Sequence, residues 1–164
     1  MPTSTHAAAH ARDHINLRLE RWHRRCVYVA SAALLLSGAA WLIARYFLRQ
    51  AGEFGETVHP LEPWAMKLHG AAAMFMLFFL GSLMNSHIRR ALHGSRNRVS
   101  GWAMMITLSA LTFTGFGLYY LAGESDRPLW SAAHWIVGLA LGALLTLHVL
   151  LGRRSRPVRR QNPA

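Results

Sequence analysis

Cysteine is nearly absent from this chain of 164 residues, since Cys26 is the only one. A single thiol excludes an intrachain disulfide, and the lack of CxxC and CxxCH spacings excludes a zinc ribbon and a covalently attached c-type haem. Acidic residues are also scarce, at 7 against 18 Lys and Arg. We expect no cleavable signal peptide, because residues 1–20 are polar and contain no apolar core.

Charged residues make up only 15% of the chain, whereas soluble domains carry about 25%. They lie in short blocks between four apolar segments, at approximately 27–48, 64–87, 99–121 and 130–151. Each segment has about the 20 residues that a helix needs to cross the hydrocarbon core of a bilayer. Helices are required because backbone polar groups in lipid must be bonded internally. The predicted fold is therefore all-α, an integral membrane four-helix bundle.

Basic residues mark one side of this predicted bundle. Arginines gather before the first apolar segment, between the second and third, and after the fourth, whereas the other two loops are acidic. The positive-inside rule then places both termini in the cytoplasm, which accounts for most of the net charge of +11 without a nucleic-acid partner. We expect a polar N-terminal segment at 1–25, a membrane domain at 26–152 and a basic cytoplasmic tail at 153–164.

Five of the ten histidines lie within or at the ends of the apolar segments. They are His23, His69, His87, His134 and His148. Ionisable groups in a membrane are costly and usually functional. His134 and His148 are fourteen residues apart, so a helix places them on one face, separated by about 21 Å. Because paired neutral imidazoles are good ligands of haem iron, the pattern predicts two non-covalent b-type haems that pass electrons.

Depth in the membrane indicates which histidines pair at the outer side. Tryptophans near the outer helix ends are typical of an interfacial aromatic belt. His134 lies four residues inside Trp130, and His69 lies five residues inside Trp64. We therefore expect His69 and His134 to form the outer pair.

Two candidates remain for the inner partner of His148. His148 lies eighteen residues from Trp130, and His23 lies eighteen residues from Trp41, so their depths agree. By helix rise, His87 lies about 7 Å deeper toward the cytoplasm than these two residues. It does share a helix face with His69 of its own segment. Depth favours His23, and face geometry keeps His87 as the alternative.

Three segments resemble the di-haem cytochrome b561 family, which includes bacterial cytochrome b561 and the cytochrome b subunits of membrane-bound hydrogenases and formate dehydrogenases. They are RWHRRCVYVASAALLLSG from residue 21, LHG from residue 68 and HWIVGLALGALLTLH from residue 134. The resemblance covers roughly residues 18–152. It implies a four-helix membrane domain that binds haem through histidines.

The resemblance also implies which residues ligate iron and what the chain does. His23 and His148 would be the axial ligands of the inner haem, and His69 and His134 those of the outer haem. Such proteins exchange electrons between membrane quinone and a redox partner subunit, such as a c-type cytochrome or a dehydrogenase. The implied location is the bacterial inner membrane, as a multi-pass protein in contact with lipid.

Two other functions remain open at this stage. A haem-free membrane anchor or assembly subunit of a larger complex would also explain four apolar helices with polar contacts between them. A self-contained quinone-linked oxidase or reductase is less favoured, because the short loops leave no room for an extramembrane catalytic domain. We therefore expect an electron-transfer subunit rather than a complete enzyme, with no catalytic residue of its own.

Overall fold

The computed structural model describes residues 21–53, 55–84, 88 and 98–154. Its helices are α1 (Arg21–Phe47), α2 (Leu61–Leu83), α4 (Arg98–Tyr120) and α5 (Arg127–Arg154). The strands β1 (Gln50–Gly52) and β2 (Gly55–Thr57) pair antiparallel between α1 and α2. His87, the alternative inner ligand, lies outside the described residues, as do 1–20 and 155–164 of the predicted terminal segments.

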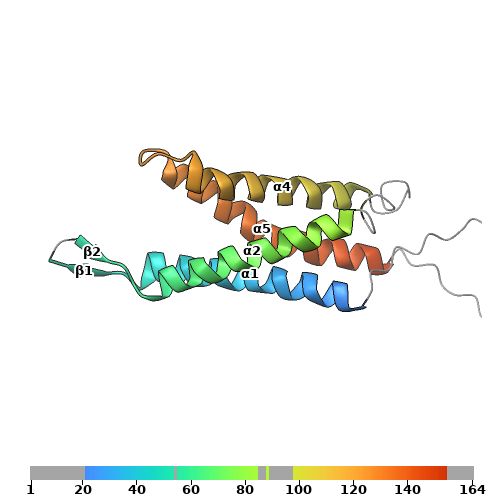
Figure 1. Ribbon diagram of the computed structural model, residues 1–164, viewed down its shortest axis with the longest axis horizontal. Coiled ribbons are helices and arrows are strands. Elements are labelled where there is room, and N and C mark those ends of the chain that lie inside the picture. Colours follow the sequence, from blue (N-terminus) through green and yellow to red (C-terminus); the bar gives the residue numbers. More distant parts are fainter. Residues whose placement is uncertain (1–20, 54, 85–87, 89–97, 155–164) are drawn as a thin grey trace, which may run out of the picture.

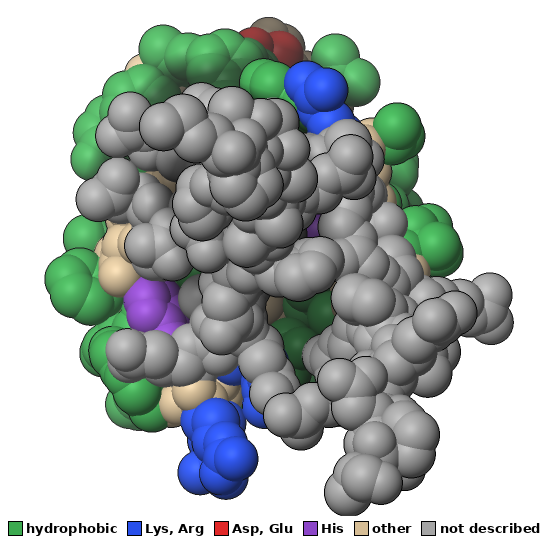
Figure 2. Space-filling model, turned by 90° about the vertical axis from the view of Figure 1, so that its right-hand side faces the viewer, with side chains coloured by type: hydrophobic (Ala, Val, Ile, Leu, Met, Phe, Trp, Pro, Cys, Tyr) green, Lys and Arg blue, Asp and Glu red, His purple; other side chains and the backbone are tan. Residues whose placement is uncertain are grey.

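All four helices are long and apolar enough to cross a membrane. The prediction of a helical chain with four apolar helices of membrane-spanning length is therefore confirmed, and the short β1–β2 hairpin is an addition to it. Large apolar side chains point outward along the helices, with Val99 86% and Phe78 71% exposed. Viewed from the end at which α1 begins, the outer sides of the bundle are hydrophobic (Figure 2). A surface of this kind is stable in lipid, where apolar side chains need no partner inside the protein.

The bundle is built from two antiparallel helical hairpins (Figure 1). Helix α1 packs along α2, and α4 packs along α5, while the described contact between the hairpins runs mainly from α1 to α5. The start of α1 and the end of α5 lie at one end of the bundle, and the β1–β2 hairpin projects from the other. This arrangement leaves α2 and α5 free to present histidines toward each other between the hairpins.

Small residues bring α1 and α2 close together. The buried residues of α1 recur at intervals of seven and are His23, Ala30, Ser37 and Ala44. Helix α2 contributes alanines at the same interval, Ala65 and Ala72. A seven-residue interval keeps one face of a helix on its partner, and small side chains there let the two backbones approach.

The seam between α4 and α5 depends on a tryptophan packed against a glycine. A Cβ at Gly117 would overlap the Trp130 ring, so only glycine fits beneath it. Phe113 lies against the same ring at a centroid distance of 5.7 Å. The indole nitrogen of Trp130 donates to Asp126 Oδ2 at 3.2 Å. Trp130 therefore holds the hairpin together at the end where the chain turns from α4 into α5, whereas Trp64 is 69% exposed.

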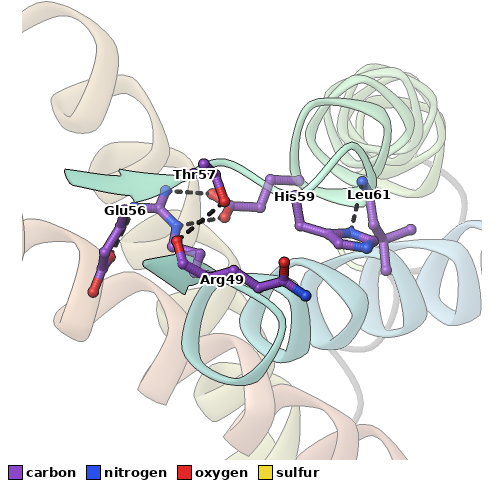
Figure 3. A network of polar contacts seen from close by, with 7 residues as sticks. Arg49, Glu56, Thr57, His59 and Leu61 are labelled. Carbon is purple, nitrogen blue, oxygen red and sulfur yellow. Dashed lines mark hydrogen bonds and ion pairs between the residues drawn. The ribbon is translucent and has the colours of Figure 1, made fainter. Parts of the chain in front are cut away.

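A partly buried ion pair fixes the end of the bundle that carries the β-hairpin (Figure 3). Arg49 donates from Nε and Nη2 to the two carboxylate oxygens of Glu62, at 2.6 and 2.7 Å. Its Nη1 also donates to Glu56 on β2 at 3.4 Å. The hydrogen bonds donated to Glu62 raise the pKa of Arg49 above its ordinary value, so it remains a cation. Gly55 turns the hairpin with φ of 109°, a backbone conformation that glycine adopts without steric cost.

Candidate functional site

Two histidines from different hairpins meet in the interior of the bundle. The ring centroids of His69 on α2 and His134 on α5 are 6.1 Å apart, with an angle of 74° between the ring planes. Both side chains are half-buried among the helices. This is the pair that their depth relative to the outer tryptophans predicts.

Each of these imidazoles is held by a hydroxyl from the other helix of its own hairpin. Ser37 Oγ on α1 lies 3.0 Å from His69 Nδ1, and Thr114 Oγ1 on α4 lies 2.8 Å from His134 Nδ1. Both contacts use Nδ1 of the ring rather than Nε2. An imidazole whose Nδ1 is engaged in this way is the form that binds a metal through Nε2.

A glycine follows each hydroxyl and gives the ring room. A Cβ at Gly38 would lie 3.4 Å from His69 Cε1, and a Cβ at Gly115 would lie 3.3 Å from His134 Cε1. A larger residue at either position would press on the imidazole that the preceding hydroxyl holds. The two hydroxyl–glycine pairs therefore form matching cradles on opposite sides of the outer histidine pair.

The same contact recurs one level deeper in the bundle. Ser100 Oγ on α4 lies 3.0 Å from His148 Nδ1 on α5. His148 is half-buried, like the two outer histidines. Three of the four predicted site histidines are thus held at Nδ1 by a hydroxyl on the neighbouring helix.

His23, the fourth predicted site histidine, has a different environment. It is only 8% exposed, and its Nε2 is the one buried side-chain nitrogen or oxygen without a hydrogen-bond partner in the described part of the chain. The Trp22 and Phe79 rings lie against it, with centroids 5.0 and 5.5 Å away. A buried imidazole nitrogen without a partner is costly in an apolar setting, and metal ligation is one way to satisfy it.

The hydroxyls could have been found in the sequence, but not from their residue type alone. Hydroxyl–glycine pairs occur at 37–38, 100–101 and 114–115. The two hydroxyls on α4 are fourteen residues apart, as are the two histidines on α5, and the helices run antiparallel. This equal spacing is the signal that links each hydroxyl to one histidine. The sequence analysis assigned no site residue to α4, which contains no histidine.

The donor set is a pair of imidazoles rather than a larger cluster. Among the residues that the structure describes, no group of three or more His, Cys, Asp or Glu side chains is arranged to hold a metal ion. Two imidazoles suit a metal whose other ligands come from elsewhere, as in a macrocycle. Comparison with protein-family models, curated proteins and solved structures finds no match for this chain.

Proposed function

We propose that this chain is a membrane cytochrome holding two non-covalent b-type haems, one between His69 and His134 and one between His23 and His148. The observation that carries the proposal is the meeting of the His69 and His134 rings across the two hairpins, at 6.1 Å between centroids. Two metal–nitrogen bonds of about 2 Å, with about 1 Å from each nitrogen to its ring centre, span a similar distance. The separation therefore suits one iron between the two rings.

The surroundings of the outer pair also suit a haem. Hydroxyl contacts at Nδ1 leave both Nε2 atoms for iron, and the glycines at 38 and 115 keep bulk away from the rings. When bound, haem supplies reversible one-electron transfer. Two protein ligands for each iron would leave no open position for oxygen, which favours a carrier of electrons over an oxidase.

The inner site rests on two separate observations. His148 has its Nδ1 held by Ser100, as the outer ligands are held by their own hydroxyls. His23 carries a buried Nε2 without a partner, which ligation would satisfy. We assign His23 rather than His87 as the partner of His148 because of this open nitrogen and the matching depth of the two residues.

Cations near the outer end would bind the haem propionates. Lys67 lies on α2 two residues before His69, and its Nζ lies 4.7 Å from the centroid of the Trp64 ring. Arg45 is an exposed residue in the last turn of α1. Carboxylates form their strongest hydrogen bonds with such charged donors. These two residues would therefore orient the outer haem through its propionates.

The proposed setting is a bacterial inner membrane with both termini in the cytoplasm. One described arginine of each block, Arg21, Arg98 and Arg153, lies at the end of the bundle from which α1 begins (Figure 1), and the positive-inside rule assigns that side to the cytoplasm. Quinone in the membrane and a partner subunit, such as a c-type cytochrome or a dehydrogenase, would exchange electrons with the two haems. Activity of periplasm-specific reporters fused at Ala164 would contradict this orientation.

The haem proposal is tested by a pyridine haemochrome assay on protein purified in detergent. We expect about two haems per chain, both released by acid–acetone because neither is covalently attached. The reduced protein should show the sharp α and Soret bands of b-type haem. A haem content near zero in protein expressed with ample haem would overturn the proposal.

A haem-free anchor or assembly subunit is the second candidate. The observation that favours it is that each hydroxyl–histidine contact joins two helices of one hairpin and so stabilises the fold by itself. Under this reading, the purified protein lacks haem bands, and a stable partner complex forms without them. The same absorption spectrum therefore separates the two candidates.

A further inference from the structure

We propose that Ser37, Ser100 and Thr114 are positioning residues that hold the histidines they contact in the tautomer protonated at Nδ1 and so set the reduction potential of each site. The inference rests on the proposed haem function and adds to it which hydroxyl controls which site. Thr114 and Ser37 act on the outer site through His134 and His69. Ser100 acts on the inner site through His148.

For Thr114 and Ser37, the place of the hydroxyl proton decides which group donates in the hydrogen bond to the histidine. Thr114 Oγ1 donates to the carbonyl of Ala110 at 2.8 Å, and Ser37 Oγ donates to the carbonyl of Ala33 at 2.6 Å. A hydroxyl has one proton. With that proton committed to the helix backbone, each oxygen is left to accept from the Nδ1–H of its histidine. The Nε2 of each ring then carries a lone pair directed away from the hydroxyl.

The register of the helices assigns each hydroxyl to one site. Ser100 and Thr114 are fourteen residues apart on α4, about 21 Å by helix rise, which is too far to act on one iron. On α1 the same interval separates Ser37 from His23. A histidine thus stands in the first hairpin at the position that corresponds to Ser100 in the second. Among the described residues, two hydroxyls therefore contact the histidines of the outer site, and one contacts a histidine of the inner site.

Accepting a hydrogen bond from Nδ1–H makes an imidazole a stronger electron donor to its metal. Stronger donation stabilises ferric over ferrous iron and lowers the reduction potential. Removing the hydroxyl should therefore raise the potential of the affected site alone. A tenfold loss of preference for the ferric state corresponds to an upward shift of about 59 mV in a one-electron couple.

The test is a redox titration of the purified haem-loaded protein, followed by visible absorbance. Thr114→Val removes the hydroxyl and keeps the shape of the side chain, and it should raise the potential of one component and leave the other unchanged. Thr114→Ser keeps the hydroxyl and should restore the wild-type potential. Thr112→Val is the matched control, because the exposed Thr112 hydroxyl donates only to the carbonyl of Leu108 at 2.9 Å.

The other two hydroxyls extend the test to both sites. Ser37→Ala should raise the same component as Thr114→Val, and Ser100→Ala should raise the other one. Loss of one haem component from Thr114→Val, with retention in Thr114→Ser and Thr112→Val, would also support the assignment. Unmoved potentials in all three hydroxyl variants would overturn the inference. Such a result is distinct from failure of the proposed function, in which the wild-type protein contains no haem at all.

Discussion

The rings of His69 and His134 lie 6.1 Å apart at an angle of 74°, although they belong to separate helical hairpins. Each ring is tied back to its own hairpin by a hydroxyl at Nδ1. The pair therefore spans the junction of the two hairpins, with one imidazole contributed from each side. A ligand held between these rings would also hold the hairpins together.

A shared outer site predicts that His69→Ala and His134→Ala have the same effect. Each variant should lose the same one of two redox components, because a single iron would lose one of its two axial ligands. His148→Ala should remove the other component, since it lies about 21 Å along α5 from His134. Redox titration of each purified variant, monitored at the α band, distinguishes the components. Loss of different components from His69→Ala and His134→Ala would disprove the pairing.

The inner site predicts that His23→Ala reproduces the loss caused by His148→Ala. His23 has a buried Nε2 with no hydrogen-bond partner, and its removal would leave the inner iron with one protein ligand. His87→Ala should retain both components. If instead His87→Ala removes the inner component and His23→Ala keeps it, the partner of His148 is His87 and not His23. Retention of both components in all five histidine variants would make these histidines structural.

The helices were predictable because hydrophobic length is a strong signal in a membrane protein. The predicted segment at 99–121 and the observed helix Arg98–Tyr120 differ by one residue at each end. Helix α1 begins at Arg21, inside the predicted polar segment, because its first turns extend the helix beyond the apolar run. The pairing of His69 with His134 was also predictable, since two residues at equal depth on neighbouring helices can meet.

Other features depend on contacts that one-dimensional patterns do not record. The strands at 50–52 and 55–57 are short and fully exposed, so they carry no alternation of apolar and polar residues. The partnership of Arg49 with Glu62 depends on the hairpin bringing the ends of α1 and α2 together. The role of Thr114 depends on the register between α4 and α5, which hydropathy does not specify.

The ion pair between Arg49 and Glu62 predicts a loss of stability when one partner is removed. Glu62→Gln leaves Arg49 as a cation that is only partly solvated, with a side chain 15% exposed. We expect a lower midpoint of thermal unfolding, because two short charge-assisted hydrogen bonds are lost and only the 3.4 Å contact with Glu56 remains for the Arg49 cation. Glu56→Gln is the control and should have a much smaller effect, since the Glu56 side chain is 71% exposed and its contact is 3.4 Å long.

The thermal experiment also has an outcome that would contradict the structure. Equal midpoints for Glu62→Gln, Glu56→Gln and the wild type would mean that the Arg49–Glu62 contact does not stabilise the fold. The haem content of Glu62→Gln should stay at the wild-type value below its unfolding temperature. This expectation follows because the pair fixes the ends of α1 and α2, and no described contact joins it to the four histidines proposed as haem ligands; its one histidine contact is from the Glu62 N–H to the carbonyl of His59 at 2.9 Å.

The glycine cradles predict a graded response to added methyl groups. Gly115→Ala should disturb the outer site most, because its Cβ would lie 3.3 Å from His134 Cε1 while Thr114 holds the same ring at 2.8 Å. The ring must shift by a few tenths of an ångström, which lengthens the Nδ1 hydrogen bond or moves Nε2. Gly38→Ala should be milder, because the nearest atom of His69 is 3.4 Å away.

Haem content and the potential of the outer component measure this response, and Gly81→Ala serves as the control because no atom lies within 4 Å of its added Cβ. Gly115→Ala should lower the occupancy of the outer component or shift its potential, whereas the inner component and Gly81→Ala should match the wild type. An effect confined to the inner component would contradict the assignment of His134 to the outer haem. An equal effect from Gly81→Ala would show that the loss comes from α-helical packing in general, because that methyl group meets no histidine.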